Sequence, residues 1–306
     1  MGSPRVGGLG GRPRAPRAGP RARARALLFA SGLLFGLLAV LARVSVNLGF
    51  SAAQVAAVRF SVATALTLAL FRVRPGAFRP RRKGLLAARG VLGGAAALLY
   101  FRALATMPAG QATLLNNTFP VAAVVISYVA LGERPGWRLA VALAVTSAGV
   151  FLVLGGGRLD LVIGWGQLVG LASAVLGGAA VTCIRALRAD HNAITIFFAF
   201  SLGGTAVSLP LAVGPWASAP GPWLAAAAAA LVAFAAQLCM TEAYGALTVA
   251  EAAVWQQITP AASYLWAMAL LGERLTPVGA AGVAVGAAGV AYASIQGHRA
   301  PAEEGA

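Results

Sequence analysis

Apolar residues run along this chain in long stretches, separated by short polar segments and by glycine- and proline-containing segments. A bilayer-spanning helix needs roughly 20 consecutive apolar residues, so each stretch predicts one transmembrane helix. The connections are short, so neighbouring helices are expected to pack antiparallel. We expect ten spans, at residues 26–46, 54–71, 84–104, 109–131, 137–154, 163–184, 192–212, 223–243, 249–271 and 277–295.

The composition indicates the same class of protein. Of the 306 residues, 59% are hydrophobic and only 10% are charged, and the mean hydropathy is +0.79. A soluble domain carries about 25% charged residues, so this chain has too few to cover a water-facing surface. The sequence therefore predicts an all-α polytopic membrane protein whose surroundings are the lipid bilayer.

The net charge of +16 arises from 24 basic and 8 acidic residues, and the basic residues cluster beside the apolar stretches. Seven arginines lie in residues 1–25, and six basic residues lie in residues 72–83. With the N-terminus inside, eighteen basic residues fall in cytoplasmic segments, against Arg158 and Arg274 in external loops. The positive-inside rule then places both termini in the cytoplasm and the chain in the cell membrane. No aromatic-rich basic surface accompanies these clusters, so no nucleic-acid partner is expected.

The ends and the middle of the chain divide it into parts. Residues 1–25 are mostly Gly, Pro, Arg and Ala without apolar periodicity, which predicts a disordered, Arg-rich cytoplasmic tail. Such a segment also resembles a secretory signal, but further apolar stretches follow at once and favour an uncleaved first helix. A glycine-rich linker, residues 155–162, separates five spans in 26–154 from five spans in 163–296. Residues 297–306 form a second cytoplasmic tail.

The two groups of spans share a repeated sequence. A shift of 140 residues aligns residues 111–151 with 251–291, and 13 of the 41 positions are identical. Since five spans is an odd number, the second copy enters the membrane from the opposite side, which predicts two inverted five-helix repeats. Inverted repeats around a central site are typical of secondary transporters. The matches include Pro120 with Pro260, Leu131-Gly132-Glu133-Arg134 with Leu271-Gly272-Glu273-Arg274, and Ala148-Gly149-Val150 with Ala288-Gly289-Val290.

On these features the chain resembles the drug/metabolite transporter superfamily, and within it the EamA-type ten-helix transporters. The resemblance rests on the two five-span halves, on a proline before Leu-Gly-Glu in each penultimate helix, and on segments Val58–Leu66, Tyr100–Pro120 and Leu176–Arg188. It covers residues 27–296. It implies a transporter that exports small organic metabolites, such as amino acids or amphipathic drugs, by alternating access. The resemblance implies little about the individual substrate.

Polar side chains inside the apolar stretches are the candidate substrate ligands. An unsatisfied polar group in hydrocarbon costs several kcal/mol, so such groups normally face the bundle interior. Adjacent helical residues diverge by about 100°, so one amide of each neighbouring pair should face a cavity and the other a helix. Interhelical hydrogen bonding without a substrate role is the alternative. Near mid-depth these residues are Asn116, Asn117, Thr118, Trp255, Gln256 and Gln257.

Two glutamates are candidates for coupling to protons or to a charged substrate. Glu251 shares a helix face with Trp255, and Glu242 lies at the end of the preceding span. A carboxylate that lines a transport path could bind an ammonium group or carry a proton. A hydrated, structural position at the membrane surface is the alternative for both.

Arginines and tyrosines supply a candidate vestibule. Arg59 and Arg43 would attract anionic groups, and Tyr100 and Tyr244 would offer apolar walls and cation–π faces. Snorkelling of the arginines and anchoring of the rings at the interface are the alternatives. Arg89 is expected to snorkel to the cytoplasmic surface.

The repeated Leu-Gly-Glu-Arg sequence predicts a structural corner in each half. Gly132 and Gly272 each end a helix, and Glu133 and Glu273 each precede the next span. A carboxylate at that position would accept hydrogen bonds from the free N–H groups of the following helix. We therefore expect these residues to set helix geometry rather than to bind substrate.

Other functional classes find less support in the sequence. HExxH, GxSxG and Walker A motifs are missing, and so are paired membrane aspartates, so we do not expect an enzyme, intramembrane or otherwise. Cys183 and Cys239 lack the spacing of a metal site, so neither metal nor cofactor is expected. Import or exchange of phosphorylated or nucleotide-linked sugars is the main alternative. It would require a cavity rich in Lys and Arg, and no lysine lies in a predicted span.

Overall fold

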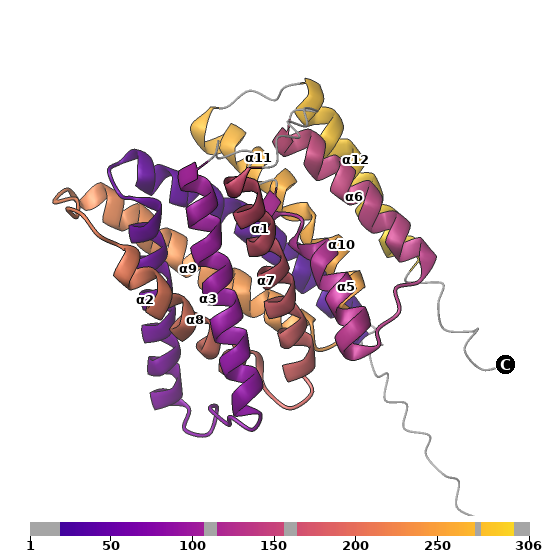
Figure 1. The fold of residues 1–306 in the computed structure, drawn as a ribbon, viewed down its shortest axis with the longest axis horizontal. Coiled ribbons are helices and arrows are strands. Elements are labelled where there is room, and N and C mark those ends of the chain that lie inside the picture. The colour runs from indigo at the N-terminus through magenta and orange to yellow at the C-terminus, as the bar shows by residue number, and fades with distance from the viewer. Residues whose placement is uncertain (1–18, 107–114, 156–163, 273–276, 297–306) are drawn as a thin grey trace, which may run out of the picture.

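The computed structural model describes residues 19–106, 115–155, 164–272 and 277–296 (Figure 1). All regular secondary structure in these ranges is helical, which confirms the all-α class. The elements are α1 (Pro20–Asn47), α2 (Ala52–Val73), α3 (Lys83–Thr106), α5 (Phe119–Leu131), α6 (Trp137–Gly155), α7 (Trp165–Leu187), α8 (Ala193–Ser208), the 3-10 turn η1 (Leu209–Leu211), α9 (Pro220–Ala243), α10 (Val249–Gln256), α11 (Ile258–Leu271) and α12 (Pro277–Gln296).

Several helices are long and apolar enough to cross a bilayer. Among the described residues these are α1, α2, α7, α9 and the continuous stretch of α8 and η1. α5 is a shorter apolar helix, and α6 and α12 each contain a shorter apolar stretch. Each predicted span coincides with one or two of the helices, except that residues 109–114 of the fourth lie outside the described residues. The chain is therefore a multi-pass membrane protein.

The first helix begins earlier than the sequence predicts. α1 starts at Pro20, so residues 20–25, predicted to belong to the disordered tail, are helical. Proline fits the first helical position because its fixed φ suits the helix and its missing N–H is not needed there. Ala24 and Arg25 are buried against the rest of the bundle. Tertiary contacts thus stabilise a helical start that lacks an apolar pattern.

The fourth and ninth spans are broken, although the apolar pattern predicts each as one helix. Asn117 and Thr118 form a turn directly before α5. In the second half, Gln257 separates α10 from α11. Asn117 and Gln257 occupy equivalent positions under the 140-residue shift, so both halves break at the same place.

Two prolines explain these breaks. Proline has no N–H, and its ring clashes with the carbonyl group four residues earlier in a helix. For Pro120 that carbonyl belongs to Asn116, and for Pro260 it belongs to Gln256. Both carbonyls therefore lose the donor that a continuous α-helix would supply. Discontinuous helices of this kind are a common feature of transporter binding sites.

Helices of the first half pack chiefly against helices of the second half (Figure 1). α1 packs along α9, α3 along α7, and α6 along α12, while α2 contacts α8 and α9. If each helix is replaced by its counterpart in the other half, the α1–α9 pair becomes the α7–α3 pair, and the α6–α12 pair becomes itself. The helix pairs therefore follow the sequence repeat.

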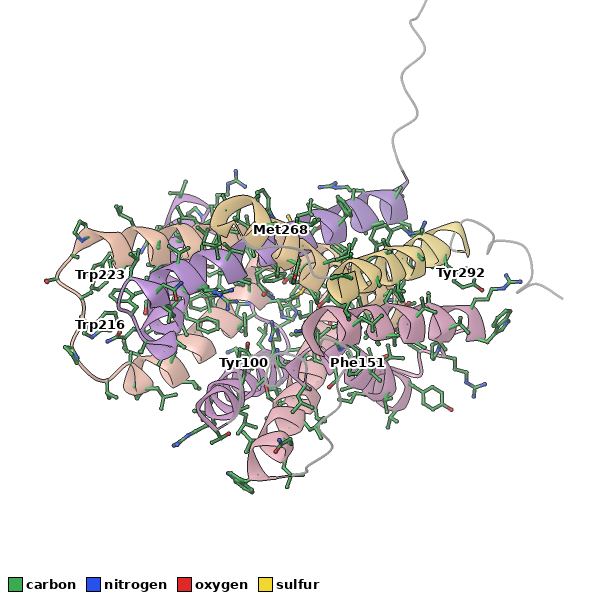
Figure 2. All side chains as sticks on the ribbon, turned by 90° about the horizontal axis from the view of Figure 1, so that it is seen from above. Tyr100, Phe151, Trp216, Trp223, Met268 and Tyr292 are labelled. Carbon is green, nitrogen blue, oxygen red and sulfur yellow. The ribbon has the colours of Figure 1, made fainter. Side chains whose placement is uncertain are left out.

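Close approach of α6 and α12 shows the repeat at the level of single residues, and the two helices lie side by side (Figure 2). A Cβ atom on Gly149 would lie 2.5 Å from the backbone nitrogen of Gly286. A Cβ atom on Gly289 would lie 2.5 Å from Cγ2 of Thr146. The shift of 140 residues turns one contact into the other. The repeated Ala-Gly-Val sequence thus permits close helix packing.

The largest buried cluster lies where α1, α3, α8 and α10 begin and α7 and α9 end. Tyr244, Leu187 and Ile184 are completely buried in it. We call this region the closed end. Its buried residues are Ala24, Leu28, Leu86, Ala123, Val181, Ile184, Leu187, Ile196, Met240, Ala243, Tyr244, Leu247, Val249 and Ala252.

Candidate functional site

A central cavity of about 340 Å³ lies between the two halves, and helices from both contribute to its wall. Val181 and Met240 belong both to this wall and to the closed end, so the buried cluster borders the cavity there. Aromatic rings on the wall are Phe35, Phe60, Tyr100, Phe119 and Phe200. Polar side chains on the wall are Arg59, Arg89, Asn116, Asn117, Gln237, Gln256 and Thr259.

The first-half amides lie at the helix break, on the cavity wall. Asn116 and Asn117 both line the cavity. The hydroxyl of Ser173 on α7 lies 3.0 Å from Oδ1 of Asn116 and 2.8 Å from the backbone oxygen of Ala96 on α3. The Ser173 hydroxyl, whose single proton is shared by these two oxygens, thus places Asn116 beside α7 and α3. Thr118 donates to the backbone oxygen of Leu115 at 2.7 Å, within the turn itself.

The second-half amides point in different directions. Gln256 lines the cavity, and its Nε2 donates to the hydroxyl of Tyr244 at 2.5 Å. Gln257 is buried and donates to Ser147 on α6 at 3.1 Å. Trp255 and Gln257 line a separate, mostly apolar groove of about 730 Å³ between α1, α10, α11 and α12. Of the second-half trio, the structure therefore brings Gln256 to the central cavity.

Glu251 lies outside the central cavity, in the first turn of α10. Its carboxylate accepts from Nε of Arg25 at 2.8 Å and lies 2.7 Å from Nη2 of the same guanidinium. Both side chains are nearly buried, at 12% and 10% exposure. The predicted disordered tail thus contributes an arginine that neutralises Glu251. The pair joins α1 of the first half to α10 of the second.

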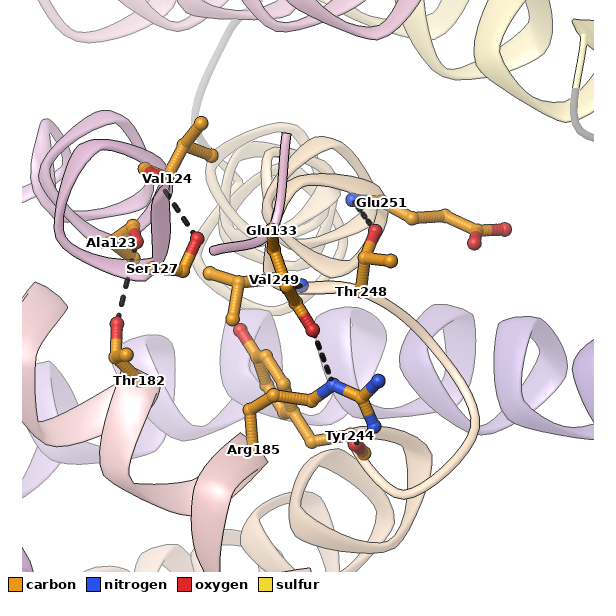
Figure 3. Close-up of polar contacts among 10 residues, drawn as sticks. All are labelled: Ala123, Val124, Ser127, Glu133, Thr182, Arg185, Tyr244, Thr248, Val249 and Glu251. Atoms are coloured by element: carbon orange, nitrogen blue, oxygen red, sulfur yellow. Dashed lines mark hydrogen bonds and ion pairs between the residues drawn. The ribbon is translucent and has the colours of Figure 1, made fainter. Parts of the chain in front are cut away.

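Glu133 also joins the two halves at the closed end (Figure 3). Its Oε1 lies 2.7 Å from Nε of Arg185 on α7, and its Oε2 accepts from the N–H of Val249 at 2.8 Å. Val249 is the first residue of α10. The predicted cap on the following helix, α6, is therefore instead a cap on α10, 116 residues away. The negative charge complements the N-terminal end of that helix dipole.

The two corner glycines adopt the same left-handed conformation. Gly132 has φ 68° and Gly272 has φ 67°, and each directly follows the last residue of a helix. Glycine favours this region because it has no Cβ atom. Glu273, the counterpart of Glu133, lies outside the described residues.

The remaining predicted residues separate into cavity and surface positions. Glu242 is half exposed and lies 3.0 Å from Nη2 of Arg188, outside the central cavity. Tyr244 is completely buried in the closed end, so its predicted position in a vestibule is wrong. Arg43 is exposed on α1, away from the cavity wall, whereas Arg59 and Tyr100 lie on that wall.

Arg89 lies in the cavity, although its sequence position predicts the cytoplasmic surface. Its side chain is 3% exposed and lies on the cavity wall, with the guanidinium 4.0 Å from the ring centre of Phe200. The expected snorkelling is therefore wrong. Arg89 lies six residues into α3, about 9 Å along the helix axis. The glycines at 90, 93 and 94 were the available signal, because small residues let neighbouring helices cover this face.

The chain matches the model of a known protein family. The model of the EamA-like transporter family matches the chain twice, over residues 23–155 and 164–295. The pseudopaline exporter CntI of Pseudomonas aeruginosa is 30% identical over 160 residues, which is 52% of this chain and 56% of that protein. This chain therefore spans about half of that relative.

A second relative and one solved structure match over more of the chain. The probable terminal-alkyne amino-acid exporter of Streptantibioticus cattleyicolor is 30% identical over 249 residues, which is 78% of this chain and 82% of that protein. A solved crystal structure with 21% identity has a TM-score of 0.76 and covers 90% of this chain and 98% of its own. That likeness shows the same fold.

Proposed function

The chain belongs to the EamA-like transporter family, and from that premise we propose that it exports small organic metabolites by alternating access. The single observation that carries the proposal is the double family match, because two copies of one unit surround the central cavity. The two homologous exporters support the outward direction. Amino acids and amphipathic molecules of similar size are the proposed substrate class.

Alternating access would open the closed end and seal the opposite end of the cavity. The Arg25–Glu251 and Glu133–Arg185 pairs each join one half of the chain to the other at the closed end. Both pairs would break when the halves rock apart there. The matching helix pairs support this mechanism, because exchange of the halves' conformations would produce the opposite-facing state.

We place both termini in the cytoplasm, on the charge bias described above. The closed end, where α1 begins, then faces the cytoplasm, and the cavity is reached from outside. A reporter that is active only in the cytoplasm should therefore be active when it is fused to the C-terminus. If the C-terminal reporter lies outside the cell, the proposed inverted arrangement of the repeats is wrong.

Export metabolomics tests the proposed function. Cells that express the chain should accumulate specific small metabolites in the medium, and purified protein in liposomes should move the same compounds. The Glu133→Ala/Arg185→Ala variant, which removes a proposed gate contact, should change the rate at which these compounds are exported. No difference between expressing and non-expressing cells, with no flux in liposomes, would contradict the proposal.

Import or exchange of phosphorylated or nucleotide-linked sugars is a second candidate, favoured by one observation. No lysine lies in a predicted span, but Arg59 and Arg89 both lie on the cavity wall and could bind a phosphate. Counterflow in liposomes loaded with a sugar phosphate distinguishes the two candidates. Uptake that depends on the internal sugar phosphate would favour the exchanger.

A further inference from the structure

We propose that the transported molecule carries an anionic oxygen group, a carboxylate or a phosphate, and that Arg89 binds this group in the central cavity. The inference rests on the proposed function, because it takes the central cavity to be the substrate site. It narrows the substrate class, since amphipathic cations would be excluded.

Arg89 is a buried charge without a protein counterion among the described residues. Its Nε atom has no hydrogen-bond partner there, and none of the ion pairs found among these residues includes it. The ring of Phe200 lies against one face of the guanidinium. A buried charge left in this way costs several kcal/mol, so charged residues inside membrane proteins usually mark a ligand or ion site.

The space around Arg89 depends on a glycine. A Cβ atom on Gly93, one turn along α3, would lie 2.6 Å from Nη1 of Arg89 and 2.7 Å from Cδ2 of Phe200. Any larger residue at this position would push the guanidinium or the ring aside. Gly93 also lines the cavity. The position of Arg89 is therefore built into the packing of α3 against α8.

The acidic residues that the structure describes are all already paired with other arginines. Arg89 therefore has no described carboxylate left to bind, and an external anion is the natural partner. The four pairs are Arg25–Glu251 at 2.7 Å, Arg82–Asp190 at 3.6 Å, Arg185–Glu133 at 2.7 Å and Arg188–Glu242 at 3.0 Å.

The rest of the cavity wall favours the same sign of ligand charge. Arg59 contributes a second guanidinium from α2, 4.8 Å from the ring centre of Phe60. No acidic side chain belongs to the described wall, so an ammonium group would find no carboxylate there. Guanidinium groups bind carboxylate and phosphate through two parallel hydrogen bonds. The aromatic rings and the amides can then hold the uncharged remainder of the molecule.

Ligand-induced thermal stabilisation of the purified full-length protein in detergent tests this inference. The probes are phenylalanine and glucose 6-phosphate, each compared with a matched compound without the anion, phenylalaninamide and glucose. We expect at least one probe to stabilise the protein and its partner without the anionic group to have no effect. The phenylalanine pair tests for recognition of a carboxylate, and the glucose 6-phosphate pair tests for recognition of a phosphate. Equal effects of a probe and its partner without the anionic group, or no effect of either probe at millimolar concentration, would overturn the inference.

Variants at Arg89 assign the effect to this residue. Arg89→Gln should weaken binding of the active probe about tenfold or more, because it removes a charge-assisted hydrogen bond. Arg89→Lys keeps the charge and should recover part of the affinity, which a purely structural role would not predict. Arg134→Gln, at an exposed position, is the matched control and should bind as the wild type does. Unchanged affinity in a folded Arg89→Gln protein would contradict the inference.

Failure of this inference and failure of the proposed function give different results. If cells expressing the wild type export only neutral or cationic metabolites, and Arg89→Gln exports them equally well, the protein is a transporter without the proposed anion site. If no metabolite is exported and none is moved in liposomes, the proposed function itself fails. Export of anionic metabolites that is lost in Arg89→Gln would support both.

Discussion

Arginines at the closed end and arginines in the central cavity have different partners. Arg25 and Arg185 each lie 2.7 Å from a carboxylate that belongs to the other half of the chain. Arg89 and Arg59 lie on the cavity wall against phenylalanine rings, and neither is among the ion pairs of the described residues. The contrast separates charges that hold the two halves together from charges that remain available to a ligand.

Desolvation explains why this contrast matters. A buried ion pair roughly compensates for the water that each charge loses, but removal of one partner leaves the other charge uncompensated. A buried arginine without a counterion bears that cost in the resting protein already. Substitutions at the closed end and in the cavity should therefore change stability in opposite directions, which the following variants test.

Glu251→Ala should have the largest effect. It leaves the nearly buried Arg25 without its carboxylate, and we expect a loss of about 3–5 kcal/mol in the free energy of unfolding. Chemical unfolding of the detergent-solubilised protein measures this. The exchanged pair Arg25→Glu/Glu251→Arg should regain part of the loss. Wild-type stability of the single variant would mean that the pair contributes nothing to the closed end.

Glu133→Gln should have the next largest effect, about 1.5–3 kcal/mol. The amide oxygen can still accept from the N–H of Val249, but the charge that faces Arg185 and the helix dipole is lost. Thermal unfolding followed by size-exclusion chromatography checks this. A matched Glu133→Asp variant keeps the charge but shortens the side chain. If the charge matters, the stability of this variant should lie between those of the wild type and of Glu133→Gln.

Arg89→Met should change stability in the other direction. Methionine fills a similar volume without a buried charge, so we expect the folded state to become about 1 kcal/mol more stable while anion binding is lost. The same unfolding assay measures it, alongside Glu251→Ala. A loss of stability as large as that of Glu251→Ala would show that Arg89 has a structural partner and would remove the contrast.

Asp190→Asn should have the smallest effect, about 0.5 kcal/mol or less. Its partner Arg82 lies 3.6 Å away, and the two side chains are 38% and 52% exposed, so water and salt screen the pair. Stability of this variant and of the wild type should converge further at high ionic strength. A large, salt-independent loss would mean that burial does not distinguish the ion pairs of this protein.

Much of the fold could be predicted from local sequence. The predicted spans lie close to the observed helices, because a helix in a bilayer must satisfy its backbone internally and expose apolar side chains. The two broken spans could not be predicted with equal ease. Pro120 and Pro260 were visible, but a proline inside an apolar stretch can also kink a helix that continues. Only the structure shows that both prolines end the preceding helical segment rather than kink it.

The candidate site was predicted only in part. Asn116, Asn117 and Gln256 lie on the cavity wall, and so do Arg59 and Tyr100. Arg89 was misplaced because the length of its side chain permits both snorkelling and burial, and only the helices around α3 decide between them. Tyr244 is predicted to line a vestibule, with anchoring at the interface as the alternative, but only the packing of the surrounding helices shows that it is completely buried.

Apolar length alone predicted the membrane class and the approximate spans, because these properties depend on neighbouring residues along one helix. The 140-residue repeat predicted the division into halves, because it is visible when the sequence is compared with itself. Only the tertiary structure decided which charges are paired. The partners Arg185 and Glu133 are 52 residues apart, and Arg25 and Glu251 are 226 apart, so no local pattern connects them. Whether a buried arginine forms an ion pair with a carboxylate depends on which helices pack together, and the amino-acid order alone does not show this.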